Sequence, residues 1–306
     1  MTNTLSELFS IEDRVAIDNN KPVLLIDGNN IVYRTLYSIM FKNPEENDTG
    51  FYLWRHTFLN NIINTIVKFN SSKVILAFDS KNSWRYDYLP TYKSNRKKSR
   101  DKSVVDFDKF FPILDEFRSD VKDIFSTIHL MDHPRSEADD IIAVLTKQQF
   151  KKNQNIIVSS DSDFHQLLID KNNQQYDPML NAIVKCLNPK AELDMKIIGG
   201  DTSDTIPAIK PRTGKVGSAK ILREGIDDFI EKEGHEEYKK NYIRNQIMID
   251  FNFIPKNISD GIIESYINYG IKDMDGSKLM KFFAKHKLNR LMSDWQGISS
   301  AIKSLK

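Results

Sequence analysis

Apolar residues in the first half of the chain follow two alternating spacings. Four short apolar runs have the length and composition of buried strands, at residues 22–27, 73–78, 127–131 and 155–160. Between them, apolar residues recur at helical spacing over residues 51–69, 105–125 and 136–150, and Pro112 is expected to interrupt the second of these helices. Because strands that alternate with helices form parallel units, the pattern predicts an α/β fold with a mostly parallel sheet and helices on both faces.

The second half of the chain has a different pattern. Residues 174–177 and 183–187 predict a hairpin around the turn at 178–181. Short helical patterns then continue to the end of the chain. We therefore expect a core domain over residues 21–188 and a helical domain over residues 189–306.

The first 20 residues are polar apart from Leu5, Leu8 and Phe9. The spacing of these three places them on one face of a short helix. Two interpretations stay open: a turn that packs on its own domain, or a docking peptide for a partner.

Acidic residues follow the predicted strands. Asp27 and Asp79 close the first two strands, and Asp161 and Asp163 follow the fourth. Five further candidates lie in two other short stretches: Glu137, Asp139, Asp140, Asp201 and Asp204. Because ligands of parallel sheets bind outside the carboxyl ends of the strands, we expect these acidic residues to meet at one edge of the sheet.

Such a gathering of carboxylates predicts divalent metal ions. Magnesium prefers oxygen ligands, and the candidates supply more carboxylates than one ion needs. Two ions roughly 3.5–4 Å apart activate a water and stabilise the leaving oxygen of a phosphodiester. We expect two Mg²⁺ ions, for which Mn²⁺ is a substitute.

Structural roles compete for some of these residues. Ser136 and Asp139 approximate a capping box, in which Asp139 only reaches back to the helix start. Helical spacing pairs Glu137 with Asp140 rather than with Asp139. Asp201 lies in a Gly-containing stretch, where an aspartate commonly serves the turn.

The net charge of +2 hides two basic segments. Residues 81–102 hold eight Lys or Arg with interleaved aromatic residues, and residues 210–223 hold five more and no acid. An ordinary run of this kind is a solvated face, but cations and aromatic rings beside a metal site suit phosphates and unpaired bases. Arg85 and Lys93 are candidates for stabilising charge on a reacting phosphate. The candidate nucleic-acid contacts are Tyr92, Arg96, Lys97, Lys210, Arg212, Lys215 and Lys220.

Composition excludes several other classes. Cys186 is the only cysteine, so we expect no disulfide and no thiolate zinc site within the chain. The six histidines show no ligand spacing, and His165 is interpreted as a surface residue. The chain shows no signal peptide and no apolar stretch that could span a membrane. These observations favour a cytoplasmic protein.

In combination and order, the motifs resemble those of the 5′ nuclease (flap endonuclease) family, and within it the T-even bacteriophage ribonuclease H branch. The matching segments are Ile26-Asp27, Phe78-Asp79, residues 84–96, Glu137 to Asp140, Ser160 to Phe164, Gly200 to Asp204 and residues 250–258. The resemblance implies a PIN-like (resolvase-like) core with a helical arch at about residues 80–103, and a helix-three-turn-helix that grips duplex DNA. It implies magnesium-dependent, 5′-to-3′ removal of RNA primers and adjoining DNA, plus cleavage of 5′ flaps, in phage DNA replication.

The resemblance also assigns roles by position. It implies that Asp27, Asp79, Asp139 and Asp161 hold the first metal, with Glu137 acting through water. It places Asp163, Asp201 and Asp204 around the second metal, and it favours Asp139 over Asp140, although Asp140 stays in the candidate set.

Partners follow from the resemblance as well. The resemblance implies a monomer that acts on DNA and RNA–DNA duplexes with 5′ ends or flaps. It also implies two protein partners, a sliding clamp and a single-strand-binding protein. Leu5, Leu8 and Phe9 then become a candidate clamp peptide. The chain departs from the family pattern at Ile206-Pro207-Ala208, where Ile-Pro-Gly is common, and in the longer segment at 210–216.

Two hypotheses of different class remain. The first is a two-metal phosphodiesterase that acts at 5′ ends of nucleic acid. The second is a catalytically inactive, structure-selective nucleic-acid-binding protein of the same fold. The full acidic set favours the first, because a protein that only binds gains phosphate affinity by losing those charges. A small-molecule phosphatase does not account for the two basic segments.

Overall fold

The computed structural model describes residues 21–306 except 42–46, 234–235, 272–274, 304 and 306. The candidate docking residues Leu5, Leu8 and Phe9 lie outside the described residues. Among the helices of the described part, none is long and apolar enough to cross a membrane.

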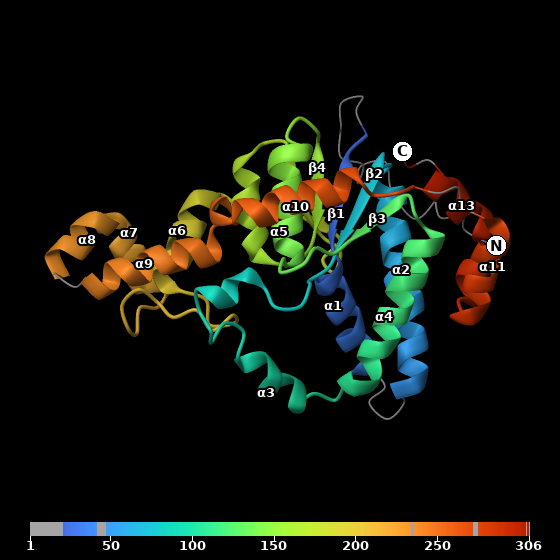
Figure 1. Ribbon diagram of the computed structural model, residues 1–306, viewed down its shortest axis with the longest axis horizontal. Coiled ribbons are helices and arrows are strands. Elements are labelled where there is room, and N and C mark those ends of the chain that lie inside the picture. Colours follow the sequence, from blue (N-terminus) through green and yellow to red (C-terminus); the bar gives the residue numbers. More distant parts are fainter. Residues whose placement is uncertain (1–20, 42–46, 234–235, 272–274, 304, 306) are drawn as a thin grey trace.

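A six-stranded sheet with the order β3-β2-β1-β4-β5-β6 forms the centre of the molecule (Figure 1). The first five strands are parallel to their neighbours, and β6 pairs with β5 in the antiparallel direction. The strands are β1 (Val23–Asp27), β2 (Lys73–Ala77), β3 (Ile128–Met131), β4 (Asn155–Val158), β5 (Asn173–Asp177) and β6 (Ala182–Ile183). The prediction of a mostly parallel sheet is therefore confirmed, and the predicted hairpin forms with a second strand that is shorter than expected.

Residues on successive positions of β1 enter two separate hydrophobic cores. Leu24 and Ile26 pack with helices on one face of the sheet, whereas Val23 and Leu25 belong to the core on the other face. This alternation follows from the period of a strand, in which neighbouring side chains point to opposite faces. Burial on both faces explains why the strand is apolar throughout.

Helices cover both faces of the sheet. One face carries α1 (Gly28–Met40), α2 (Asn47–Phe69) and α4 (Phe107–Ile124), and the other carries α5 (Ala138–Val144) and α10 (Lys256–Ile267). Pro112 lies inside α4, which continues through it, so the predicted interruption is wrong. The predicted helix at 136–150 is α5 followed by a π-helical turn, η4 (Leu145–Gln149). Two short 3₁₀ helices, η3 (Trp84–Asp87) and η5 (Ser162–Ile169), and helix α3 (Asn95–Asp101) lie in the connections near the carboxyl edge.

Beyond the sheet the chain forms a lobe at one end of the molecule (Figure 1). The lobe contains α6 (Pro189–Gly199), α7 (Lys215–Glu224), α8 (Ile226–Glu233) and α9 (Glu236–Ile249). After η6 (Phe251–Phe253) and α10, the chain ends in α11 (Gly276–Lys285), α12 (Asn289–Ser293) and α13 (Trp295–Lys303).

The last helices return to the core instead of extending the lobe. Phe282 of α11 stacks on Phe117 of α4 with ring centroids 5.8 Å apart, and Phe283 is buried in the same core. The predicted helical domain at 189–306 is therefore divided between the lobe and the core. The reason is the apolar face of α11, which is buried only when the helix packs on the outer surface of α4.

Candidate active site

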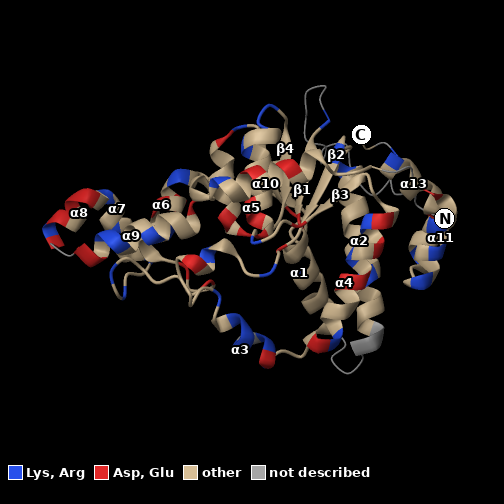
Figure 2. Ribbon diagram, in the orientation of Figure 1, with Lys and Arg blue, Asp and Glu red and all other residues tan. Residues whose placement is uncertain are grey.

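The parallel strands bring the first group of carboxylates to one edge of the sheet. Asp27 ends β1, Asp79 lies two residues after β2, and Asp161 precedes η5 after β4. Asp139 lies in the first turn of α5, which follows β3. Figure 2 shows acidic residues where these strands end. We call Asp27, Asp79, Asp139 and Asp161 the first acidic group.

Local hydrogen bonds orient these carboxylates. Asp27 accepts from the backbone amide of Asn30 at 2.9 Å and from the hydroxyl of Ser159 at 3.0 Å. Asp79 accepts from the backbone amide of Ala138 at 2.9 Å, and Asp161 caps the start of η5. Helix and turn starts thus hold the carboxylates in place before any metal binds, because their free amides seek acceptors.

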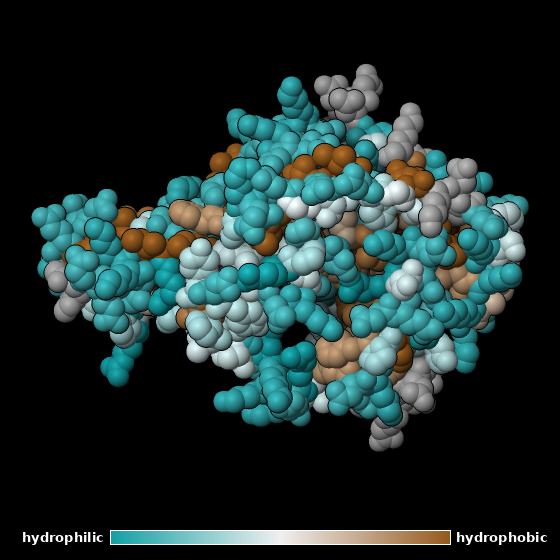
Figure 3. All heavy atoms as spheres, viewed as in Figure 1, coloured by the Kyte–Doolittle hydropathy of each residue, from teal (hydrophilic) through white to brown (hydrophobic). Residues whose placement is uncertain are grey.

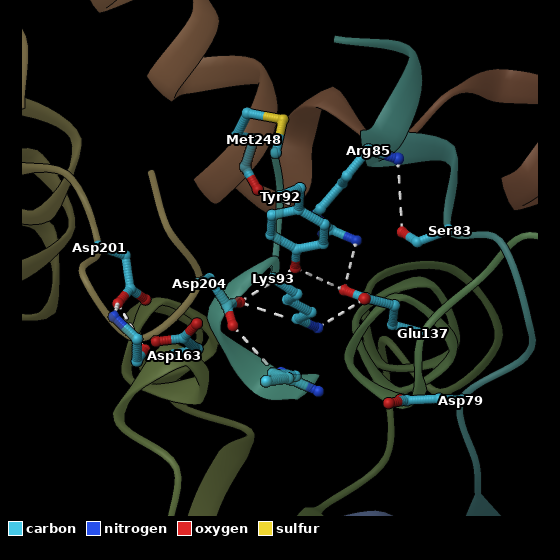
Figure 4. A network of polar contacts seen from close by, with 12 residues as sticks. Asp79, Ser83, Arg85, Tyr92, Lys93, Glu137, Asp163, Asp201, Asp204 and Met248 are labelled. Carbon is cyan, nitrogen blue, oxygen red and sulfur yellow. Dashed lines mark hydrogen bonds and ion pairs between the residues drawn. The ribbon is translucent and has the colours of Figure 1, made fainter. Parts of the chain in front are cut away.

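A second acidic group lies beside the first, toward the lobe. Asp163 and Asp201 both contact Lys196 of α6, and the Lys196 Nζ lies 2.8 Å from Asp201 Oδ2. Asp204 accepts from the Tyr92 hydroxyl at 3.0 Å and from Arg96 at 3.1 Å (Figure 4). We call Asp163, Asp201 and Asp204 the second acidic group.

Electrostatics of the first group show a shortage of positive charge. Burial raises the pKa of Asp27 to about 7, and the charges of Asp79 and Asp161 add to this rise. Burial, followed by repulsion from neighbouring carboxylates, raises the pKa of Asp139 well above its ordinary value. In the second acidic group, burial likewise raises the pKa of Asp163 to about 6, although Lys196 opposes this rise. The folded chain holds more negative charge here than it neutralises.

This donor set fits hard divalent cations. All the candidates offer carboxylate oxygens, which Mg²⁺ prefers. Within the described residues, no three of these carboxylates place oxygens within 4.8 Å of one another, so the two groups form an open arrangement. The first group would hold one ion and the second group another, and bound ions would supply an activated water and stabilise a leaving oxygen.

The structure does not support Asp140 as a metal ligand. The side chain is fully buried, and its oxygens accept from Arg85, from the Trp84 indole at 3.0 Å and from the Glu137 backbone amide at 2.9 Å. Asp140, not Asp139, therefore completes the capping box, with Glu137 at the helix start. This corrects both the metal prediction for Asp140 and the capping alternative for Asp139.

Arg85 is not placed to contact a substrate phosphate. Its guanidinium is 4% exposed, its Nε donates to the Met248 carbonyl at 2.9 Å, and its terminal nitrogens bond Asp140 and Glu137. Every nitrogen of the guanidinium is occupied, so the predicted catalytic role is wrong. Arg85 instead neutralises two buried carboxylates and ties α5 to α9.

Tyr92 is also buried, so the prediction that it contacts nucleic acid is wrong. Its ring packs with Leu193, Ile197 and Met248, and its hydroxyl donates to Glu137 and Asp204. An aromatic ring can stack on a base only when one face is exposed. Tyr86 and Tyr88 in the same segment are 40% and 49% exposed.

Lys93 lies between the two acidic groups, as Figure 4 shows. Its Nζ is 2.5 Å from Glu137 Oε1 and 3.8 Å from Asp204 Oδ2. Burial alone would raise the pKa of Glu137, but Lys93 and Arg85 lower that pKa to about 2, so Glu137 stays ionised. The Lys93 backbone has φ of 54°, and its amide donates to the Asp204 carbonyl at 2.9 Å, which fixes the segment against the lobe.

The remaining basic candidates lie on the surface. Arg96 and Lys97 are exposed on α3, and Arg212, Lys215 and Lys220 are exposed at and around the start of α7. Lys210 differs, because it pairs with Glu233 at 2.9 Å. Sequence reasoning missed Lys196, since nothing in its local pattern shows that α6 turns it toward Asp163.

Together, a parallel sheet with carboxylates at its carboxyl edge and a cationic segment beside them define a metal-dependent nuclease. The family model of the 5′-3′ exonuclease N-terminal, resolvase-like domain matches residues 22–196. The family model of the T4 RNase H C-terminal region matches residues 188–297. The chain therefore belongs to the 5′-3′ exonuclease family and is a nuclease of the two-metal type. This confirms the fold and the family predicted from the motifs.

Individual relatives sharpen the assignment. Ribonuclease H of Enterobacteria phage T4 is 29% identical over 90% of this chain and 95% of its own length. A 5′-3′ exonuclease of Buchnera aphidicola (Schizaphis graminum) is 33% identical, over 63% of this chain and 67% of its own. A bacteriophage T5 flap endonuclease solved with DNA and metal ions has the same fold, with a TM-score of 0.64 and 18% identity, over 81% of this chain and 98% of that one.

Proposed function

We propose that this chain is a 5′-to-3′ exonuclease and 5′-flap endonuclease that uses two Mg²⁺ ions, with Mn²⁺ as a substitute. Its substrates are DNA and RNA–DNA duplexes with 5′ ends or flaps. Its role is to remove RNA primers and adjoining DNA during phage lagging-strand replication. It acts as a monomer in the host cytoplasm, with a sliding clamp and a single-strand-binding protein as partners.

The observation that carries this proposal is the contact that the arch, residues 80–103, makes with Glu137 and with Asp204 of the second acidic group. Lys93 and Arg96 of the arch lie on Glu137 and Asp204, at 2.5 Å and 3.1 Å. The Lys93 ammonium and the Arg96 guanidinium are thereby in place to meet the oxygens of a phosphodiester bound beside these carboxylates. Lys93 is therefore the residue that we assign to stabilising charge on the reacting phosphate.

The arch also supports selection of 5′ ends. Figure 3 shows an opening between the α3 segment and the body of the molecule. Arg96, Lys97, Lys98 and Arg100 lie on α3 beside it and are exposed. A cationic passage of this kind suits an unpaired strand, whose phosphates pair with the basic side chains.

Hydrogen bonds orient two of the acidic residues toward the site. Asn30 and Ser159 orient Asp27, and the Ala138 amide orients Asp79. These carboxylates would hold Mg²⁺, which would supply a water of lowered pKa and stabilise the leaving oxygen. The exposed cations of α7 hold the duplex through its phosphates, away from the reacting bond.

The test uses a duplex with a labelled 5′ RNA flap in Mg²⁺. Wild type and the control Asp260→Asn, an exposed residue of α10, should release short labelled products. Asp161→Asn should bind the flap but cut at least ~100-fold more slowly, because a metal ligand is lost. A covalently closed circle, which has no 5′ end, should remain intact.

Two results would contradict the proposal. Cutting of the closed circle at the same rate would remove the dependence on 5′ ends. Binding by wild type without any cutting, unchanged by Mg²⁺, would establish the catalytically inactive binding protein instead.

A further inference from the structure

A second set of ligand-type side chains lies on the edge of the lobe, outside the two acidic groups. His165 of η5, Cys186 in the segment before α6, and Glu192 in the first turn of α6 each offer one atom, and these atoms lie within 4.8 Å of one another. His165 Nδ1 is 2.6 Å from Glu192 Oε2. In the described part of the chain this is the one group of three or more His, Cys, Asp or Glu residues that converges so closely.

We propose that His165, Cys186 and Glu192 form a binding site for one zinc-type divalent cation, separate from the magnesium sites. Sulfur, imidazole nitrogen and carboxylate oxygen are the three ligand types that zinc takes, and water completes a tetrahedron. Mg²⁺ is a poor match, since it prefers oxygen ligands throughout. This inference does not depend on the nuclease function.

The existing contacts show how the site takes up a cation. The Glu192 carboxylate lies against both partners: its oxygen hydrogen-bonds the His165 ring, and the Cys186 sulfur is within 4.8 Å. A divalent cation replaces the thiol proton between sulfur and carboxylate. Thiolate and carboxylate then balance its two positive charges, and one proton leaves to solvent.

Accessibility agrees with an exchangeable ion. The Glu192 side chain is 50% exposed and the His165 side chain 19% exposed, so water reaches the fourth position. Glu192 and His165 also line a groove of about 650 Å³ that continues to Asp163 and Asp201 of the second acidic group. The cation site and the second acidic group therefore share one groove while using different ligand chemistry.

The site joins three segments that are distant in sequence. His165 lies two residues after Asp163, Cys186 follows the edge hairpin, and Glu192 opens the helix that carries Lys196. A bound cation would link η5 of the core to α6 of the lobe. Because such an ion binds only the folded chain, it stabilises this junction.

This proposal revises two expectations from the sequence. A single cysteine predicts no thiolate zinc site, and the six histidines show no ligand spacing. Cys186 is one ligand of a mixed site, and 20 residues lie between His165 and Cys186 in the chain. Spacing of that length carries no recognisable motif.

The experiment titrates the whole chain with Co²⁺ in excess Mg²⁺ and records its electronic absorption. Because Cys186 is the only cysteine, a thiolate-to-cobalt charge-transfer band can arise from that residue alone. We expect one Co²⁺ per chain to produce the band and Zn²⁺ to abolish it by displacement. Cys186→Ser should lack the band, and the control Glu231→Gln, on α8, should retain it.

The other two ligands are tested through affinity. His165→Ala and Glu192→Gln should each weaken Zn²⁺ binding at least ~10-fold in competition with a chromophoric chelator. A missing band in wild type would overturn the proposal. A band with unchanged affinity in both variants would also overturn it, because that result marks cation binding by an isolated thiol.

A second measurement uses only the wild type, so it applies even if the variants do not fold. In wild type, Zn²⁺ in excess Mg²⁺ should slow alkylation of Cys186 at least ~10-fold, since the bound thiolate is shielded. An unchanged alkylation rate at saturating Zn²⁺ would contradict the site without any substitution.

Discussion

Replacing Asp27 by Asn should stabilise the metal-free protein while removing its response to magnesium. Asp27 is 5% exposed and ends β1 beside Asp79 and Asp161. Asn is nearly the same size, keeps the acceptor for the Asn30 amide, and can donate to the Ser159 hydroxyl. The substitution therefore removes the charge and leaves the packing in place.

The magnitude follows from the pKa. Burial and then neighbouring charge raise the pKa of Asp27 from 3.8 to about 7. That change corresponds to roughly 4 kcal/mol of lost stability when the group is ionised in both states. Relaxation around a buried charge reduces such values, so we expect Asp27→Asn to gain about 2 kcal/mol in free energy of unfolding at pH 8.

The gain should depend on pH with a definite sign. Because the folded pKa lies above the unfolded one, the folded state binds the extra proton between about pH 4 and pH 7. Wild-type stability therefore falls, relative to Asp27→Asn, as the pH rises through this window. At pH 5 the gain should be less than half of its value at pH 8.

Urea unfolding in EDTA, followed by circular dichroism, measures both values. The control is Asp260→Asn, an exposed residue, which should change stability little and equally at both pH values. Adding Mg²⁺ should then raise the stability of wild type much more than that of Asp27→Asn. A variant less stable than wild type at pH 8 in EDTA, or a gain of equal size at pH 5 and pH 8, would refute the reasoning.

Three further predictions concern other parts of the molecule. Arg85→Ala should cost roughly 3–5 kcal/mol in urea unfolding, because it leaves two buried carboxylates without their cation; a loss of activity with unchanged stability would restore a catalytic role for Arg85. In duplex binding, Lys215→Ala and Lys220→Ala should each reduce the slope of log affinity against log salt concentration by about 0.9, because each removes one phosphate contact. The control Glu236→Gln should leave the slope unchanged. An unchanged slope in both lysine variants would show that the duplex does not bind at α7. Gly200→Ala should lower the melting temperature and weaken duplex binding, because Gly200 has φ of 69° and a Cβ would lie 2.3 Å from the backbone oxygen of Ile206. Gly214→Ala is the control, since a Cβ there meets no atom within 4 Å. A melting curve of Gly200→Ala identical to that of wild type would contradict this prediction.

The sequence by itself determined the sheet and the place of the site. Fully apolar runs separated by helical spacing predict a parallel sheet buried on both faces, and the order of strands and helices requires their carboxyl ends to share one edge. Asp27, Asp79 and Asp161 directly follow such runs, so their meeting follows from local pattern. The family motifs added the second acidic group.

Only the tertiary structure decided which neighbouring side chains face the site. Successive residues of an α-helix point about 100° apart, so Asp139 and Asp140 face different directions from α5. Burial of Ile141 and Ile142 fixes the orientation of the helix, and this orientation turns Asp140 toward Arg85. Arg85 and Tyr92, which the sequence predicts at the substrate surface, are likewise buried in the interior. Lys196, the return of α11 to the core, and the cluster of His165, Cys186 and Glu192 all depend on contacts between distant segments, which no local periodicity records.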